Sequence, residues 1–222
     1  MPHPRHGIGA WYSDGVHWVT KWILWALFKL ITGCEVIGWQ HVPKQGGGIM
    51  VCNHASHLDP AAAGAHAPRL MSYFAKQELM ENWKWRWWYL ACRVIPVARA
   101  SRASLLALRE AIHRIQHGEM LLVFPEGTRS PDGALQEPKP GVGLLLYETR
   151  VPVVACYVEG SNQVLPREAK MIRPNKIRIY YGRPVQIDVT RPPGRPMGEH
   201  LQYLADRVMD EVRKLQQQAK GA

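Results

Sequence analysis

An α/β fold, with a β-sheet flanked by helices, is the fold class that the amino-acid sequence predicts. Short apolar runs rich in β-branched residues alternate along the chain with stretches whose apolar residues recur at helical spacing. The chain has 222 residues and is 46% hydrophobic, so it can bury a sizeable core within one domain. Alternation of this kind is typical of a sheet that carries helices on its faces.

Six apolar runs have the length and composition of strands. They are residues 48–52, 70–74, 94–97, 120–124, 151–158 and 176–181. Between most of them lie helical patterns, at residues 60–67, 77–92, 101–116 and 141–148. Ser101 is a credible N-cap for the third of these helices. A last helix is indicated over residues 201–215, after the proline- and glycine-rich breaker at 191–196.

The N-terminal segment carries a stripe of tryptophans. Four of them share one face of a helix predicted over residues 8–32: Trp11, Trp18, Trp22 and Trp25. Only residues 22–28 separate Lys21 from Lys29, which is too short an apolar run to span a bilayer. Tryptophan prefers the membrane interface, where its ring meets acyl chains and its N–H meets water. An in-plane interfacial helix with both lysines near lipid phosphates is therefore favoured over a helix packed on the core.

The charge balance is strongly basic, with 28 Lys and Arg against 18 Asp and Glu, a net charge of +10. This charge suits nucleic acid, an anionic membrane or an anionic small substrate, and charge alone does not choose among them. The four cysteines lie far apart with no Cys-x-x-Cys pair, which indicates neither a zinc site nor a disulfide framework. A reducing, cytosol-facing location is the simplest interpretation.

Two loops carry the residues for chemistry, and each follows a predicted strand. Residues 53–59 read Asn-His-Ala-Ser-His-Leu-Asp, and residues 124–130 read Phe-Pro-Glu-Gly-Thr-Arg-Ser. His54 and Asp59 are too far apart for one helical turn but suit a tight loop in which the carboxylate folds back on the imidazole. Such pairing fixes the tautomer and raises the basicity of the ring. Ligands of α/β sheets gather beyond strand ends, so these loops and Arg99 are expected to meet at one site.

Four motifs in order resemble those of the glycerolipid acyltransferase family, whose best-known members are the 1-acylglycerol-3-phosphate (lysophosphatidic acid) acyltransferases. The likeness covers roughly residues 35–190. Residues 53–59 meet the first block, Asn-His-x-Ser-x-x-Asp, and residues 124–130 meet the third at every position. The second block ends Ile-Pro-Val-Ala-Arg at 95–99, with Ala98 where an acid is frequent, and in the fourth Ala155 replaces proline. These two departures leave the acceptor and the acyl chain open.

The resemblance implies the glycerolipid acyltransferase fold, a mixed sheet flanked by helices with an N-terminal membrane-associated helix. It divides the chain into an amphipathic membrane-interface segment, residues 1–34, and an acyltransferase catalytic domain, residues 35–222. The implied enzyme is an O-acyltransferase at the cytoplasmic face of a membrane. It moves a fatty acyl chain from acyl-CoA or acyl carrier protein to the free hydroxyl of a lysophospholipid, above all 1-acylglycerol-3-phosphate. The acyl donor is a substrate, and no cofactor is implied; the oligomeric state stays open.

His54 is the predicted general base. An attacking hydroxyl must lose its proton, and imidazole, with a reference pKa of about 6.5, suits that task near neutral pH. Asp59 is expected to accept a hydrogen bond from the far ring nitrogen and to stabilise the imidazolium, as the carboxylate of a catalytic triad does. Ser56 lies nearby, but no Gly-x-Ser-x-Gly elbow surrounds it, so loop hydrogen bonding is expected of it.

The predicted substrate-binding residues serve a phosphate-bearing acceptor. Arg99 and Arg129 are the main candidates because the planar guanidinium matches phosphate oxygens, and Lys139 is a weaker candidate for the same pocket.

The rest of the third motif has other expected roles. Gly127 lets the backbone approach closely or take a positive φ, and Thr128 can donate through its hydroxyl. Glu126 repels phosphate and is expected instead to position the acceptor hydroxyls or to hold an arginine.

Other functions have weaker support. His57, His66 and Cys52 lie near His54 in the sequence, but no second cluster of ligands is visible and no metal is predicted. Residues 83–88 mix bases with tryptophans as a nucleic-acid groove does, yet one helical face is shared by Leu79, Trp83, Trp87 and Leu90. Packing or a wall for an acyl chain is favoured there, then membrane contact, with nucleic acid last.

Two alternatives to the leading acceptor remain. One is an acyltransferase for another lysolipid, such as a lyso-aminolipid. The other is a non-catalytic, basic, tryptophan-rich module that binds membrane or nucleic acid, and the intact pair of His54 and Asp59 argues against it.

Overall fold

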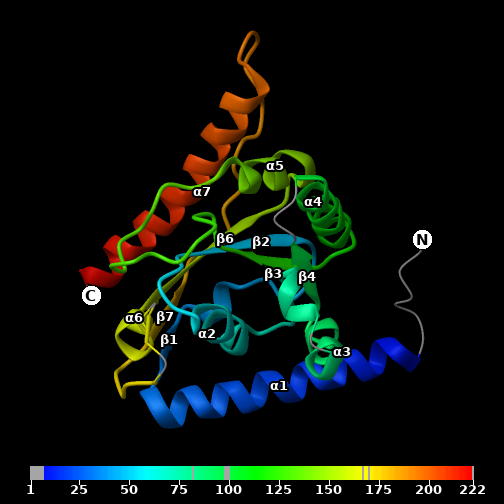
Figure 1. Cartoon of the computed structure of the whole chain (residues 1–222). Coiled ribbons are helices and arrows are strands. Elements are labelled where there is room, and N and C mark those ends of the chain that lie inside the picture. Colours follow the sequence, from blue (N-terminus) through cyan, green and yellow to red (C-terminus); the bar gives the residue numbers. More distant parts are fainter. Residues whose placement is uncertain (1–7, 82, 98–100, 167, 170, 222) are drawn as a thin grey trace.

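The computed structural model describes residues 8–81, 83–97, 101–166, 168–169 and 171–221 (Figure 1). In these residues seven strands form one sheet in the order β1-β7-β6-β2-β5-β3-β4. The strands are β1 (Glu35–Ile37), β2 (Gly48–Cys52), β3 (Met71–Lys76), β4 (Val94–Val97), β5 (Met120–Val123), β6 (Val153–Glu159) and β7 (Arg178–Tyr181). The pair β6 and β7 is antiparallel and the other neighbouring pairs are parallel, which confirms the predicted mixed sheet.

Helices cover both faces of the sheet. They are α1 (Ile8–Thr32), α2 (Asp59–His66), α3 (Trp83–Ala91), α4 (Ser101–Gln116), α5 (Pro140–Thr149), α6 (Ser161–Val164) and α7 (Met197–Lys220), with short 3-10 turns η1 (Trp39–His41) and η2 (Gln77–Met80). The predicted helix over 77–92 is divided into η2 and α3, and the last helix begins earlier and ends later than predicted. Strand β1 was not predicted because three residues are too few to show a pattern.

The fully buried strand β2 separates two apolar cores. Ile49 and Val51 belong to a core shared with α4, α5 and α7, whereas Met50 and Cys52 belong to a core shared with α2. Successive side chains of a strand point to opposite faces, so one strand supplies both cores. A central strand buried in this way provides a rigid support for the loop that follows it, which begins at Asn53.

Helix α1 lies across α2 and α3 on the outer side of the second core (Figure 1). Its buried positions recur at helical spacing and are largely polar: His17, Lys21, Phe28 and Thr32. Polar contacts also join it to α3 and to the turn after it. Trp88 Nε1 donates to Thr20 Oγ1 at 3.0 Å, and Arg93 pairs with Asp14 at 2.6 Å. The division predicted at residue 34 falls just after this helix ends.

The opposite face of α1 is apolar and exposed. It carries Trp18, Val19, Trp22, Ile23, Trp25, Leu27, Leu30 and Ile31, of which Leu30 is 84% exposed. A surface helix of a globular protein normally has the reverse arrangement, with its apolar stripe toward the core. The side chain of Trp11 falls outside the described residues. In the described part of the chain, no helix has the length and apolar character needed to cross a membrane.

Lys21 does not lie on the outer surface of α1. Its side chain is 8% exposed, and its ammonium donates to the carbonyl of Ala65 at 2.7 Å. Burial lowers the pKa of Lys21 to about 8. Lys29 is exposed and donates to the carbonyl of Cys34 at 3.3 Å.

Candidate active site

The predicted pair of a histidine and an aspartate lies where β2 ends and α2 begins. His54 follows β2, and Asp59 is the first residue of α2. His54 Nδ1 lies 3.1 Å from Asp59 Oδ2, so the loop folds the carboxylate back on the imidazole as expected. Asp59 is fully buried, while the His54 side chain is 17% exposed. The imidazole is therefore accessible at a site where its partner is shielded from water.

Asp59 is held by the backbone as well as by His54. Its Oδ2 accepts hydrogen bonds from the N–H groups of Ala55 and Ser56, both at 2.7 Å. The carboxylate also lies in the first turn of α2, where the helix dipole favours negative charge. These contacts fix the carboxylate before any substrate binds. Because Nδ1 faces it, Nε2 is the ring nitrogen left to accept a proton.

The second loop frames the same imidazole. The ring of His54 stacks on Phe124 with centroids 4.2 Å apart. The backbone N–H of His54 donates to Glu126 Oε1 at 3.0 Å, and the N–H of Ser130 donates to the His54 carbonyl at 2.7 Å. Strands β2 and β5 are parallel neighbours, so their following loops meet at one edge of the sheet. The two motifs form one site.

Asn53 and Ser56 have structural contacts in this site. The Asn53 amide exchanges two hydrogen bonds with the backbone of Val158, at 3.0 and 2.8 Å, and so extends the pairing of β2 with β6 by one residue. Ser56 Oγ donates to the carbonyl of Leu165 at 2.8 Å and accepts from the N–H of Leu58 at 3.2 Å. This is the loop hydrogen bonding expected of Ser56.

Glu126 has a role that the sequence did not suggest. It is buried, and its two oxygens accept from the His54 N–H and from Gln136 Nε2, the latter at 2.9 Å. Burial raises the pKa of the Glu126 carboxyl, while the hydrogen bonds from His54 and Gln136 act in the opposite direction. Glu126 thus braces the loop of the histidine. Gln136 was not anticipated because it follows the motif at a distance, in an irregular segment.

Gly127 and Lys139 are brought together at the second loop. Gly127 has φ of 67°, the left-handed conformation expected of it, and a Cβ there would lie 2.9 Å from Lys139 Cδ. The Lys139 N–H donates to the Pro125 carbonyl at 2.9 Å and so ties the start of α5 to this loop. Thr128 is exposed and Arg129 is half-buried. The absent side chain of Gly127 leaves room for the lysine.

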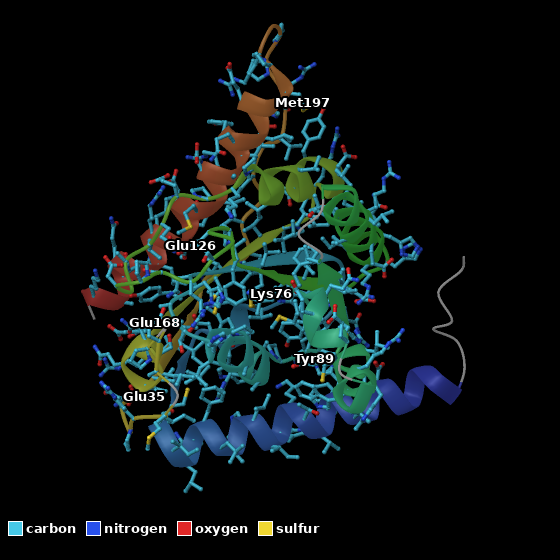
Figure 2. The ribbon with its side chains drawn as sticks, viewed as in Figure 1. Glu35, Lys76, Tyr89, Glu126, Glu168 and Met197 are labelled. Atoms are coloured by element: carbon cyan, nitrogen blue, oxygen red, sulfur yellow. The ribbon has the colours of Figure 1, made fainter. Side chains whose placement is uncertain are left out.

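Basic side chains lie within electrostatic reach of His57, three residues after His54. Burial is the main cause that lowers the pKa of His57, and the positive charges of Arg129 and Lys76 act in the same direction. Lys76 ends β3, which is the neighbour of β5 in the sheet, and Figure 2 labels it together with Glu126. Lys76 was not anticipated because the predicted strand ended at residue 74 and the candidate residues were taken from the motifs. Arg99, predicted for the same pocket, lies outside the described residues.

Metal and thiol chemistry have no support among the described residues. No group of three or more His, Cys, Asp or Glu side chains there is arranged to hold a metal ion. Cys52 lies next to the site but is fully buried, and burial raises the pKa of its thiol well above the usual range. A buried neutral thiol is a poor nucleophile. Among the described residues, the histidine and its carboxylate are the candidate reactive groups of this edge of the sheet.

Comparison with known proteins identifies related chains. Residues 33–159 match the family described as Acyltransferase. A protein of Limnanthes alba named 1-acyl-sn-glycerol-3-phosphate acyltransferase is 27% identical, with 84% of this chain and 64% of that protein covered. A Bacillus subtilis protein of the same name is 24% identical, with 86% and 92% covered. The chain thus spans less than two thirds of the plant protein.

A solved structure agrees with these matches. The crystal structure of the 1-acyl-sn-glycerophosphate (LPA) acyltransferase PlsC from Thermotoga maritima aligns with a TM-score of 0.69 at 25% identity. The alignment covers 97% of this chain and 84% of that one. The matches bear out the resemblance drawn from the four motifs.

Proposed function

Since the chain belongs to the Acyltransferase family, we propose that it transfers a fatty acyl chain from acyl-CoA or acyl carrier protein to the free hydroxyl of a lysophospholipid. The leading acceptor is 1-acylglycerol-3-phosphate, which gives phosphatidic acid. The observation that carries the proposal is the contact of His54 Nδ1 with Asp59 Oδ2 at 3.1 Å, in a loop beside basic side chains. The names of the relatives support the choice of acceptor.

The proposed chemistry is general-base catalysis of acyl transfer. Nε2 of His54 removes the proton from the acceptor hydroxyl as its oxygen attacks the thioester carbonyl carbon. The C–S bond then breaks, and the departing thiolate takes the proton from the imidazolium. Asp59 stabilises the imidazolium between these steps through its hydrogen bond with Nδ1. The products are the ester and the free thiol of the donor.

The phosphate of the acceptor is proposed to bind the basic side chains around this base. Arg129, Lys139 and Lys76 supply positive charge, and Arg99 is proposed for the same role from the motif. Arginine binds phosphate through two parallel N–H groups, whereas lysine acts as a point charge. Phosphate bound on this side of His54 keeps the acceptor hydroxyl within reach of the base.

We further propose that α1 holds the enzyme at the cytoplasmic face of a membrane. The helix presents an exposed face of tryptophan, leucine and isoleucine, and its polar face is turned toward α2 and α3. An exposed apolar stripe with tryptophans suits a helix that lies in the interface plane. Lysophospholipid acceptors reside in that interface.

The test is a panel of lysolipids offered with acyl-CoA and with acyl carrier protein donors, followed by mass spectrometry of the products. We expect phosphatidic acid from 1-acylglycerol-3-phosphate as the main product. Efficient acylation of a lyso-aminolipid instead would assign another acceptor to the same base. Lipid binding without thioester turnover on any acceptor would refute the catalytic proposal in favour of a binding module.

A further inference from the structure

A cleft with a volume of about 750 Å³ lies between α1, β1 and the end of α2. We call it the Trp–Lys cleft after its lining, which includes Trp18, Lys21, Trp22, Lys29, Ile37 and Trp39. Neither the loop at 53–59 nor the loop at 124–130 contributes to it. The cleft is therefore separate from the candidate active site.

Lys21 gives this cleft a buried cation. Its ammonium has three N–H donors, and in the described part of the chain it makes one hydrogen bond, to the Ala65 carbonyl. The rings of Trp18 and Trp22 lie 5.5 and 5.7 Å from its nitrogen, measured to their centroids. Two donors thus remain for a ligand. A cation at a site this poor in water gains from an anionic partner.

The acidic residue of the cleft does not cancel this charge. Glu35 lines the cleft but is paired with Lys176 and with Arg178, whose Nε lies 3.1 Å from its carboxylate. Hydrogen bonds from these two side chains lower the pKa of the Glu35 carboxyl. The carboxylate is therefore ionised, and its negative charge is balanced by Lys176 and Arg178. Lys21 and Lys29 consequently leave the cleft positive.

The walls of the cleft are aromatic and accessible. Trp22 is 58% exposed and Trp39 is 48% exposed, and they come from two separate elements that line the cleft, α1 and η1. Trp22 also belongs to the exposed apolar face of α1, so cleft and face are continuous. A ligand that suits this cleft has a phosphate group for the two lysines and acyl chains for the tryptophans.

We propose that the Trp–Lys cleft binds one anionic phospholipid of the bilayer, with its phosphate on Lys21 and Lys29 and its acyl chains along Trp22 and Trp39. This inference rests on the membrane placement proposed above and not on the acyl-transfer chemistry. The lipid is an anchor and not a substrate. Because Lys21 contacts Ala65 near the end of α2 and Asp59 begins the same helix, the bound lipid sets the height of the active site above the membrane.

The experiment titrates the full chain with dihexanoyl phosphatidylglycerol, kept below its micellar concentration, and follows intrinsic tryptophan fluorescence. We expect saturable binding of one lipid per chain, and much weaker binding of dihexanoyl phosphatidylcholine. Lys21→Gln keeps a donor for Ala65 but removes the charge, and it should weaken binding about tenfold. Trp39→Ser removes the aromatic lining supplied by η1 without changing the sequence of α1 and should also weaken binding. Lys214→Gln on α7 is the matched control and should change nothing.

Three outcomes overturn the inference. Equal affinity for inorganic phosphate would mean a free-anion site, and unchanged binding in folded Lys21→Gln and Trp39→Ser variants would mean that the lipid lies elsewhere. Loss of binding in Arg129→Gln instead would locate the lipid in the active site. Circular dichroism and melting temperatures check folding throughout. The His54→Ala variant separates the two proposals, because it should lose acyl transfer and still bind the lipid; absence of acyl transfer in the unmodified chain would refute only the proposed function.

Discussion

Replacing Asp59 by asparagine tests the proposed base without removing it. In the folded chain Asp59 Oδ2 accepts from Ala55 N–H, Ser56 N–H and His54 Nδ1. Asparagine is the same size and keeps one carbonyl oxygen for the two backbone donors. That oxygen occupies the place of Oδ2, so it also still accepts from the Nδ1–H group of His54 and the tautomer is kept. It carries no charge, however, and therefore stabilises the imidazolium less than the carboxylate does.

The magnitudes follow from these three contacts. Hydrogen bonds to a charged group contribute about 1.5–3 kcal/mol and neutral ones about 0.5–1.5, so weakening the two backbone bonds costs on the order of 2 kcal/mol of stability. Asp59→Ala would leave both buried donors unpaired and is the poorer choice. A lost general base typically costs about 10² to 10⁴ in rate. We expect His54→Ala to reach the upper part of this range and Asp59→Asn to impair turnover less completely.

The assay is steady-state turnover at a temperature where melting curves show every variant folded. Asp188→Asn is the matched control, since Asp188 is also an aspartate that accepts from a backbone N–H, that of Thr190 at 2.9 Å, and it lies outside the site. It should retain full turnover. Near wild-type turnover in folded His54→Ala would refute the assignment of the base. Near wild-type turnover in folded Asp59→Asn would refute the proposed stabilisation of the imidazolium by the Asp59 charge.

Three further predictions concern the phosphate, the membrane and pH. Arg129→Gln, and likewise Arg99→Gln, should lower kcat/KM for a phosphate-bearing acceptor by about tenfold or more, because one charge-assisted contact is lost. The KM of the donor should change less. Titrations of acceptor and donor measure this, and an effect on the donor alone would contradict it. Serine at three exposed positions of α1 should release the protein from anionic liposomes while a short-chain soluble acceptor is still used; the positions are Trp18, Trp22 and Trp25. Co-sedimentation with the liposomes measures the release. Salt should remove only part of the binding of the wild type. Unchanged sedimentation of the folded triple variant would refute the membrane role of these tryptophans. Burial, with the charge of Arg93 as the next cause, lowers the pKa of His17 to about 4. The unfolded chain therefore binds a proton that the folded chain does not, so stability falls as pH drops from about 6.5 toward 4, by about 2 kcal/mol near pH 5. Denaturant unfolding of the wild type and of His17→Leu should show a smaller loss of stability over this pH range in the variant, and equal slopes would argue against it.

The parts of the fold that the sequence predicted are those in which local pattern and burial agree. Strands 48–52 and 94–97 and the helix 101–116 have the predicted bounds because each is bounded by clear signals. The contact of His54 with Asp59 was also predicted, since five residues of loop leave few ways to satisfy a buried carboxylate. Glu126 was different. Its partners, His54 and Gln136, belong to separate segments, and only the sheet brings them together.

Helix α1 shows why the predicted stripe did not reveal which face packs. Periodicity says which residues share a face, but tryptophan gains from burial in protein and at a membrane interface alike, so the pattern does not say what that face meets. The other face is determined by α2, a short helix whose last carbonyls lack partners within the helix. Lys21 donates to one of them, at Ala65, where the helix dipole also favours a cation. Because α1 supplies this cap, its polar side must turn inward, and the tryptophans are left facing outward.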